Sequence, residues 1–190
     1  MNPMNRTLVL VSLLVLLSGC ASQPESISYY LLHSPDNAAE LSKPQAQQKV
    51  VLRSLELAEY LQNRHIVMQL ASNKLQFSNK HRWAENLHTG VEKALLNSLN
   101  RQSDKALYLS PRQLGDENAV ELFVELKHFL ITNDSTALVS GNFWLKGQKD
   151  GSSIQSFNIK RDLNSDGYPH AIDQLRSAID KLAEKINKTL

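Results

Sequence analysis

The chain of 190 residues carries 21 Lys and Arg against 19 Asp and Glu, 42% hydrophobic residues and a single cysteine. Because the charges nearly balance and no long block of one sign occurs, the sequence argues against a nucleic-acid-binding protein or a polybasic membrane surface. One cysteine excludes an internal disulfide and a metal site built from several thiolates.

The N-terminus resembles the leader of a bacterial lipoprotein. A polar start that contains Arg6 precedes an apolar stretch of ten residues, Leu8 to Leu17, interrupted only by Ser12. The run Leu17-Ser18-Gly19-Cys20 then looks like a lipobox, the processing and acylation signal of such proteins. Ten helical residues rise about 15 Å, half of a bilayer core of about 30 Å, so the stretch is too short to span a membrane.

We therefore expect residues 1–19 to be removed as a signal peptide and Cys20 to carry acyl chains such as palmitate, a stable membrane anchor. An ordinary secretory signal with a chance cysteine is the alternative. By analogy with lipoprotein sorting, Ala21 in place of Asp favours the outer membrane, on its periplasmic face. Residues 20–26 form a polar tether that reaches at most about 25 Å, and residues 27–190 form a single globular domain.

Strand and helix patterns follow one another through the first half of this domain. The predicted strands are Ile27 to Leu32, Val50 to Leu57, and a hairpin of His65 to Leu70 and Lys74 to Phe77 that turns at Ser72-Asn73. The residues Leu87, Val91, Leu95 and Leu99 recur every four positions and predict an amphipathic helix over Trp83 to Asn100. A short strand, Leu107 to Leu109, comes next.

The clearest strand signal is a long hairpin between Val120 and Gly147. Apolar residues take the even positions of its first arm and the odd positions of its second arm. A two-residue turn at Asn133-Asp134 brings even positions opposite odd ones, so both arms place these residues on one face. Val124 then lies opposite Phe143. His128 falls on the same apolar face, as a hydrogen-bonded core residue.

The same register gathers a second set of apolar residues on the opposite face of the hairpin. It pairs Phe123 with Trp144 and Phe129 with Leu138. Several exposed aromatic side chains together usually mark a contact surface. We expect this face to contribute to self-association or to a partner interface, unless the N-terminal strand or the loop over residues 33–49 covers it.

The last part of the chain predicts one more strand and a C-terminal helix. A turn at Asp150-Gly151 leads into a strand over about Ile154 to Leu163, and a helix begins near Pro169. The apolar stripe of this helix consists of Ile172, Leu175, Ile179, Leu182 and Ile186. The predicted fold class is α+β, with a mostly antiparallel sheet and both amphipathic helices packed on one face.

Oxygen-bearing residues between this strand and helix follow the spacing of a calcium loop. They are Asp162, Asn164 and Asp166, with Asp173 at the twelfth position. Pro169 does not suit such a loop, so an Asp-Gly turn that leads into the helix is the favoured interpretation. The six histidines have no zinc-site spacing, and no nucleophile elbow or phosphate loop occurs, so we expect a non-enzymatic protein without a cofactor.

Three short runs carry a resemblance to a known family. They are Tyr29-Tyr30-Leu31-Leu32, Leu57-Ala58-Glu59-Tyr60-Leu61 followed by Ile66-Val67, and His81-Arg82-Trp83-Ala84-Glu85 at the opening of a helix. In order and spacing they resemble the PqiC/YmbA group, the auxiliary lipoproteins of ABC-type mammalian-cell-entry (MCE) lipid transport systems. The group often has proline where this chain has Ala58 and Asn86.

The resemblance implies an outer-membrane lipoprotein that docks the end of a periplasm-spanning, PqiB-like MCE protein and supports envelope integrity. It also implies a non-enzymatic subunit that forms a homo-oligomeric ring. Tyr60, Arg82 and Trp83 are then candidates for the interface or for the scaffold. Two alternatives remain open. One is an auxiliary lipoprotein of another envelope or secretion complex, and the other is a membrane-tethered hydrolase with a perturbed His or carboxylate in a pocket.

Overall fold

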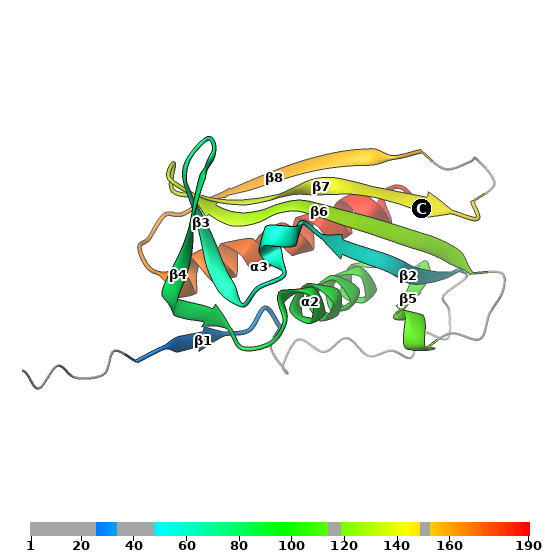
Figure 1. Cartoon of the computed structure of the whole chain (residues 1–190). Helices are drawn as coiled ribbons and strands as arrows, with labels where there is room; N and C mark the ends of the chain where they lie inside the picture. Colours follow the sequence, from blue (N-terminus) through cyan, green and yellow to red (C-terminus); the bar gives the residue numbers. More distant parts are fainter. Residues whose placement is uncertain (1–25, 34–47, 114–118, 149–152) are drawn as a thin grey trace, which may run out of the picture.

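In the computed structural model, which describes residues 26–33, 48–113, 119–148 and 153–190, two helices cover one face of an eight-stranded sheet (Figure 1). The strands are β1 (Ser28–Tyr30), β2 (Gln48–Leu57), β3 (His65–Ala71), β4 (Lys74–Trp83), β5 (Ala106–Leu109), β6 (Val120–Thr132), β7 (Thr136–Lys146) and β8 (Gln155–Asp162). The helices are α2 (Leu87–Gln102) and α3 (Tyr168–Asn187), with two 3-10 helices, η2 (Glu59–Leu61) and η3 (Pro111–Gln113). The predicted α+β fold class is confirmed. The predicted lipid site at Cys20 and the turn at Asp150-Gly151 lie outside the described residues.

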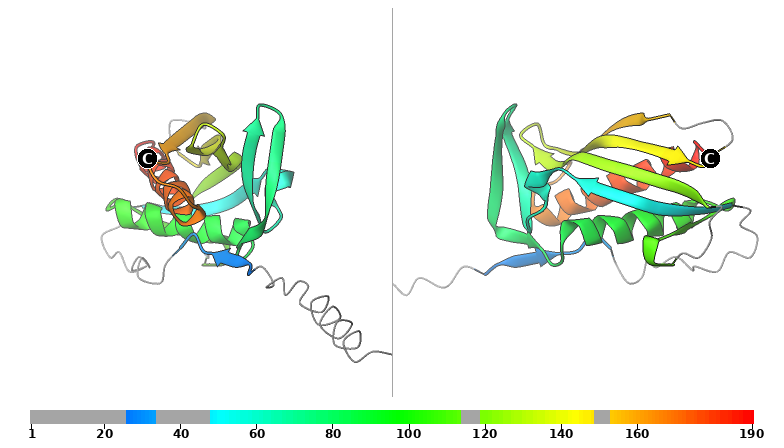
Figure 2. Two further views of the ribbon diagram at one scale, coloured as in Figure 1. Left: turned by 90° about the vertical axis from the view of Figure 1, so that its left-hand side faces the viewer. Right: turned by 45° about the vertical axis from the view of Figure 1, so that its right-hand side comes forward.

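β6 lies in the middle of the sheet and pairs with three other strands, β2, β3 and β7. β7 pairs with one edge of β6 along most of its length, so β2 and β3 must follow one another along the other edge. The two longest ladders, β6–β7 and β7–β8, are antiparallel as predicted. The β1–β4, β2–β5, β2–β6 and β3–β6 ladders are parallel. The β3–β4 hairpin and β1 together form one end of the molecule (Figure 2).

β4 runs further than predicted, past Phe77 to Trp83, so the predicted helix start at Trp83 is wrong. The Trp83 N–H donates to Arg64 O at 2.7 Å, which holds this residue in the strand. The helix begins after Asn86 because the Asn86 side chain accepts a hydrogen bond from the His88 N–H at 3.0 Å. The family-like run that includes Trp83 therefore contains the end of β4 and stops before the helix begins.

The β6–β7 hairpin departs from the predicted register in the half nearest its turn. The connection has three residues, and the third, Ser135, has a positive φ of 52°. The three-residue turn shifts the pairing of β6 and β7 by one position from the predicted register. One extra residue of β6, Lys127, forms a β-bulge that removes this shift further along the strands. Between the bulge and the start of β6 the predicted pairs are confirmed, among them Val124 with Phe143.

Between the bulge and the turn, each side chain of β6 lies on the face of the sheet opposite to the predicted one. Phe129 pairs with Val139, not with Leu138 as predicted, and is buried in the core. His128 is exposed, not in the core as predicted, and its Nδ1 lies 2.8 Å from Ser140 Oγ. Both errors have one cause, because a slip of one residue moves every side chain of a strand to its other face.

Gly141 and Tyr60 make the bulge possible. Gly141 lies opposite Leu126, and a Cβ at this position would overlap the backbone oxygen of Glu125. The Tyr60 hydroxyl of η2 donates to the Lys127 backbone oxygen at 2.9 Å. The bulge is thus fixed by a missing side chain on one neighbouring strand and by a hydrogen bond from the connection after β2.

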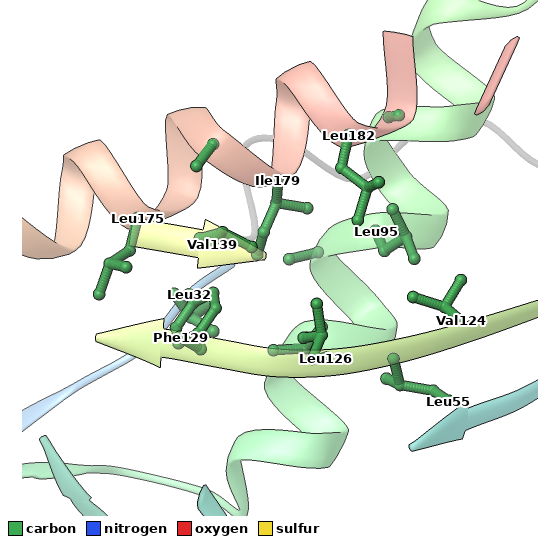
Figure 3. Packing of buried hydrophobic residues seen from close by; sticks show 14 of the residues in the cluster. Leu32, Leu55, Leu95, Val124, Leu126, Phe129, Val139, Leu175, Ile179 and Leu182 are labelled. Atoms are coloured by element: carbon green, nitrogen blue, oxygen red, sulfur yellow. The ribbon is translucent and has the colours of Figure 1, made fainter. Parts of the chain in front are cut away.

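The apolar stripes of both helices meet on the same face of the sheet (Figure 3). The core includes Leu32, Leu55, Leu95, Val124, Leu126, Phe129, Val139, Leu175, Ile179 and Leu182. Burial of one such side chain contributes about 1.5–3 kcal/mol, so the predicted stripes supply much of the stability of the fold. Within the described ranges, no helix is both long enough and apolar enough to cross a membrane.

A polar link joins the two helices at Asp180. Its Oδ1 accepts hydrogen bonds from Ser98 Oγ at 2.6 Å, Arg176 Nη1 at 2.9 Å and Arg101 Nη2 at 2.7 Å. Ser98 is fully buried, and the Arg176 side chain is only 16% exposed. Because all three donors share one carboxylate, the packing of α2 against α3 depends on it.

Candidate functional site

On the sheet face away from the helices, Phe123 of β6 and Trp144 of β7 form a stacked pair, here called the outer aromatic pair. The ring centroids are 5.2 Å apart and the ring planes differ by 1°, as in an offset stack. Lys146 Nζ lies 4.8 Å from the Phe123 centroid, within cation–π range. The predicted pairing is confirmed, and both rings are only half-buried. β1 does not cover the pair because it lies along β4, and most of the loop over residues 33–49, the other candidate cover, lies outside the described residues.

Polar side chains surround the outer aromatic pair. Asn142 Nδ2 donates to Glu125 Oε2 at 2.8 Å, and Ser156 Oγ donates to Asn142 Oδ1 at 2.9 Å. On the other side, Arg53 Nε lies 3.2 Å from Glu121 Oε1. An apolar centre within a polar rim is the usual anatomy of a protein–protein contact surface.

The other predicted interface residues divide between core and surface. Trp83 and Phe129 are 3% and 2% exposed, and their rings pack together with centroids 6.0 Å apart, so both are scaffold residues. Leu138 is half-buried on the outer face. Tyr60 is half-buried, and burial raises its pKa to about 12. Its hydrogen bond to Lys127 also gives it a structural role.

Arg82 lies in a row of residues that crosses three strands. It is in register with Tyr29 of β1 on one side and with His65 of β3 on the other. The His65 ring packs edge-on against Phe77, with centroids 6.4 Å apart and planes at 81°. Sequence reasoning found Arg82 but missed its neighbours. No local pattern indicates these neighbours, because the residues at positions 27–31 do not alternate in the sequence and the β1–β4 ladder joins distant segments.

A pocket of about 460 Å³ lies between the end of β2 and the start of α2, lined by Leu55, Glu56, Leu57, Gln62, Asn86 and His88. His88 Nε2 lies 2.9 Å from the Leu55 backbone oxygen. Because a carbonyl oxygen only accepts, this nitrogen must carry the proton and is not free to act as a base. None of the described lining residues is a serine, threonine or cysteine, so the pocket offers no side-chain hydroxyl or thiol nucleophile.

Two further described groups have clearly shifted pKa values, each with a structural cause. Burial raises the pKa of Tyr108, whose hydroxyl donates to Asn187 Oδ1 at 2.6 Å. Hydrogen bonds from Lys188 and Lys181 lower the pKa of Glu184 to about 2. None of these groups lines the pocket between β2 and α2. Tyr108 lines a second pocket, of about 280 Å³, further along α2, but its hydroxyl is engaged by Asn187, so its shift reflects burial in the fold.

The residues with calcium-loop spacing do not form a cluster of ligands. Asp162 ends β8, and Gly167, with a φ of 103°, directly precedes α3. In the part of the chain that the structure describes, no group of three or more His, Cys, Asp or Glu residues could hold a metal ion. The segment leads directly into α3.

Comparison with known protein families identifies the family of this chain. The sequence profile described as "ABC-type transport auxiliary lipoprotein component" matches residues 30–187. The chain belongs to this family. The predicted resemblance to the PqiC/YmbA group is thereby confirmed. Comparison with curated protein sequences gives no significant match.

Solved structures share the fold of this auxiliary lipoprotein. The crystal structure of an uncharacterized protein has a TM-score of 0.73 and 20% identity, over 87% of this chain and 99% of that chain. A protein from Xanthomonas campestris has a TM-score of 0.62 and 14% identity, over 85% of this chain and 92% of that chain. The PelC dodecamer from Paraburkholderia phytofirmans has a TM-score of 0.37 and 14% identity, over 76% and 89% of the two chains, too low to support an argument.

The described residues of this auxiliary lipoprotein thus offer two surface features for function. One is the outer aromatic pair, and the other is the row from Tyr29 to Phe77 at the opposite end of β6.

Proposed function

We propose that this auxiliary lipoprotein is the outer-membrane subunit of an intermembrane lipid transport system of the MCE type. It docks the end of a periplasm-spanning MCE protein and so supports envelope integrity. The observation that carries the proposal is the family match over residues 30–187, supported by the lipobox-like run that ends at Cys20. Acyl chains on Cys20 hold the domain at the periplasmic face of the outer membrane, because the tether reaches only about 25 Å. The subunit is non-enzymatic and uses no cofactor.

Copies of this lipoprotein associate through the outer aromatic pair. Phe123 and Trp144 present large rings that lose little conformational entropy when a partner covers them. The polar groups around them, including the Arg53–Glu121 ion pair, suit the rim of such an interface. The proposed assembly is a homo-oligomer that presents several copies to the MCE protein.

Crosslinking in cells, followed by purification of the lipoprotein and identification of its partners, tests this function. The expected result is an MCE-domain protein together with crosslinked copies of the chain itself. Recovery of components of another envelope or secretion complex, without an MCE protein, would contradict the proposal. Mass spectrometry of the same material should find residues 1–19 removed and Cys20 acylated, and an unmodified sulfur would contradict the anchor.

The non-enzymatic role has a test of its own. The pocket beside α2 contains His88 and Glu56, the groups that a hydrolase would need to use. The purified chain is expected to hydrolyse phospholipid esters no faster than its His88→Ala variant. A turnover that His88→Ala abolishes while the fold is retained would overturn this part of the proposal.

A further inference from the structure

Exposed apolar side chains gather at one end of the molecule. Among the described residues, six large hydrophobic side chains are exposed, and five of them lie on β1, beside it, or on the β3–β4 hairpin. These five are Ile27, Tyr29, Leu31, Leu70 and Phe77, each at least 37% exposed. Figure 2 shows β1 and the hairpin side by side at this end of the fold. The sixth, Ile154, directly precedes β8, a strand that pairs only with β7 and not with β1 or the hairpin.

The hairpin also carries charge of one sign only. Between Gln62 and Trp83 the basic residues are Arg64, Lys74, Lys80 and Arg82, and there is no Asp or Glu. The near balance of charge over the whole chain hides this local excess. In addition, Arg82 Nε is buried and has no hydrogen-bond partner in the described structure. Because this nitrogen is inaccessible, only the Nη groups of the half-buried Arg82 side chain can meet an anion that approaches from outside.

The same end of the fold lies closest in sequence to the proposed anchor. Ser28, the first residue of β1, follows Cys20 by eight residues, which span at most about 28 Å even when fully extended. An acyl group on Cys20 therefore keeps β1 near the bilayer surface. β1 pairs with β4, so the hairpin is held at the same place.

We infer that this end of the molecule, the membrane-facing end defined by Tyr29, Leu31, Phe77 and Arg82, rests on the surface of an anionic phospholipid bilayer. Tyr29 and Phe77 lie at the depth of the headgroups, where aromatic side chains are favoured in membranes. The guanidinium of Arg82, through its Nη groups, is attracted to lipid phosphate. The inference rests on the proposed function in one respect only, the acyl anchor at Cys20.

The acylated chain in vesicles provides the test, because acylation of Cys20 leaves a newly introduced cysteine as the only free thiol. Leu31→Cys, Phe77→Cys and, as the control, Ile154→Cys are labelled with an environment-sensitive fluorophore. A nitroxide quencher on the lipid headgroup is expected to quench the labels at positions 31 and 77 several-fold more than the label at 154. Phe77 is the decisive position because it lies far from the anchor in sequence.

Arg82→Gln provides the electrostatic arm of the test. One basic residue near an anionic surface favours contact about fivefold, so this variant should lower the ratio of docked to undocked domain by about that factor. The loss is expected in vesicles that contain phosphatidylglycerol and not in vesicles of phosphatidylcholine alone. An unchanged melting temperature confirms that the variant folds. Equal losses in both vesicles would overturn the role of Arg82.

The remaining outcomes are also distinct. If the lipid quencher affects positions 31 and 77 no more than position 154, the inference is wrong. If both positions are shielded from the lipid quencher and from aqueous iodide, a second protein chain covers this end, which also overturns it. Mass spectrometry of Cys20 in the same sample tests the anchor separately, so a failure of the proposed function is told apart from a failure of the membrane contact.

Discussion

Two carboxylates one turn apart on α3, Asp180 and Glu184, should differ sharply in what they contribute to stability. Each forms ion pairs with two basic side chains. The partners of Glu184 are Lys181 and Lys188, which are 56% and 72% exposed. Asp180 instead accepts from groups at the α2–α3 contact, including one that is fully buried. We predict that Asp180→Ala destabilises the fold and that Glu184→Ala changes its stability little.

The magnitude follows from the donors that Asp180→Ala leaves behind. Ser98 Oγ retains an acceptor in Ala94 O, 2.8 Å away. Arg176, which is 16% exposed, loses its carboxylate, and removal of one partner from a fully buried ion pair destabilises by about 3–5 kcal/mol. Because Asp180 is itself 33% exposed, water takes up part of this loss, and we expect about 2 kcal/mol. For a domain of this size the melting temperature should then fall by about 4–8 °C.

Thermal and guanidinium unfolding of both alanine variants, followed by circular dichroism, measures the difference. Both substitutions place alanine in the same helix, and the gain in helix propensity is larger for Asp180→Ala, so propensity opposes the expected difference and cannot cause it. Equal shifts for Asp180→Ala and Glu184→Ala would refute the reasoning. The pKa of Glu184 is lowered from 4.5 to about 2, so its contribution to stability is complete above about pH 4.5 and is lost as the pH falls through about 2; because Glu184 and both lysines are exposed, water screens this contribution and keeps it small.

Three further predictions concern the bulge and the outer face. Gly141→Ala should destabilise the fold by about 3 kcal/mol, because the new Cβ would overlap backbone atoms of the neighbouring strand. Gly90→Ala should instead stabilise it by up to about 1 kcal/mol, because the new Cβ lies at ordinary contact distance and alanine favours the helix. Denaturation midpoints in the reverse order would contradict this prediction. The pKa of Tyr60 is about 12 in the folded chain and 10 in the unfolded chain, so the parent chain should lose stability as the pH rises from 10 to about 12. Tyr60→Phe should remove this part of the loss. Identical pH profiles of the free energy of unfolding in urea for the two chains would contradict the prediction. Trp144→Lys should lower the oligomeric mass measured by light scattering without changing the melting temperature, and Ile154→Lys should not; an unchanged mass for Trp144→Lys would count against the interface.

Sequence patterns predicted the structure wherever one period runs through a whole element. The stripe of α3 is buried as predicted because a helix has no other means of covering it. The hairpin shows where such a pattern fails. In the sequence, Leu126 and Leu130 continue the alternation of even positions, so the extra residue at Lys127 leaves no visible break. Phe129 then looks like a member of the outer face, although the bulge turns it inward.

The start of α2 and the row of residues around Arg82 were not predicted, for different reasons. Trp83 continues the four-residue spacing of Leu87 and Val91 backward, so periodicity alone extends the helix too far. The hydrogen bond at the Asn86 cap decides the true start. The row through Tyr29 and Arg82 depends on a parallel ladder between strands that lie far apart in sequence, and such ladders have no connecting turn to indicate the register.

The two proposed surfaces can act independently because they lie at opposite ends of β6. Phe123 precedes Ile131, the residue beside β3, by eight positions, or about 25 Å along the strand. Copies can thus associate through the outer aromatic pair while each keeps its membrane-facing end on the bilayer. Trp144→Lys should lower the oligomeric mass and leave lipid quenching at position 77 unchanged. Arg82→Gln should leave the oligomeric mass unchanged and lower the lipid quenching at position 77. Loss of both properties in either variant would show that membrane contact requires assembly and would refute this separation.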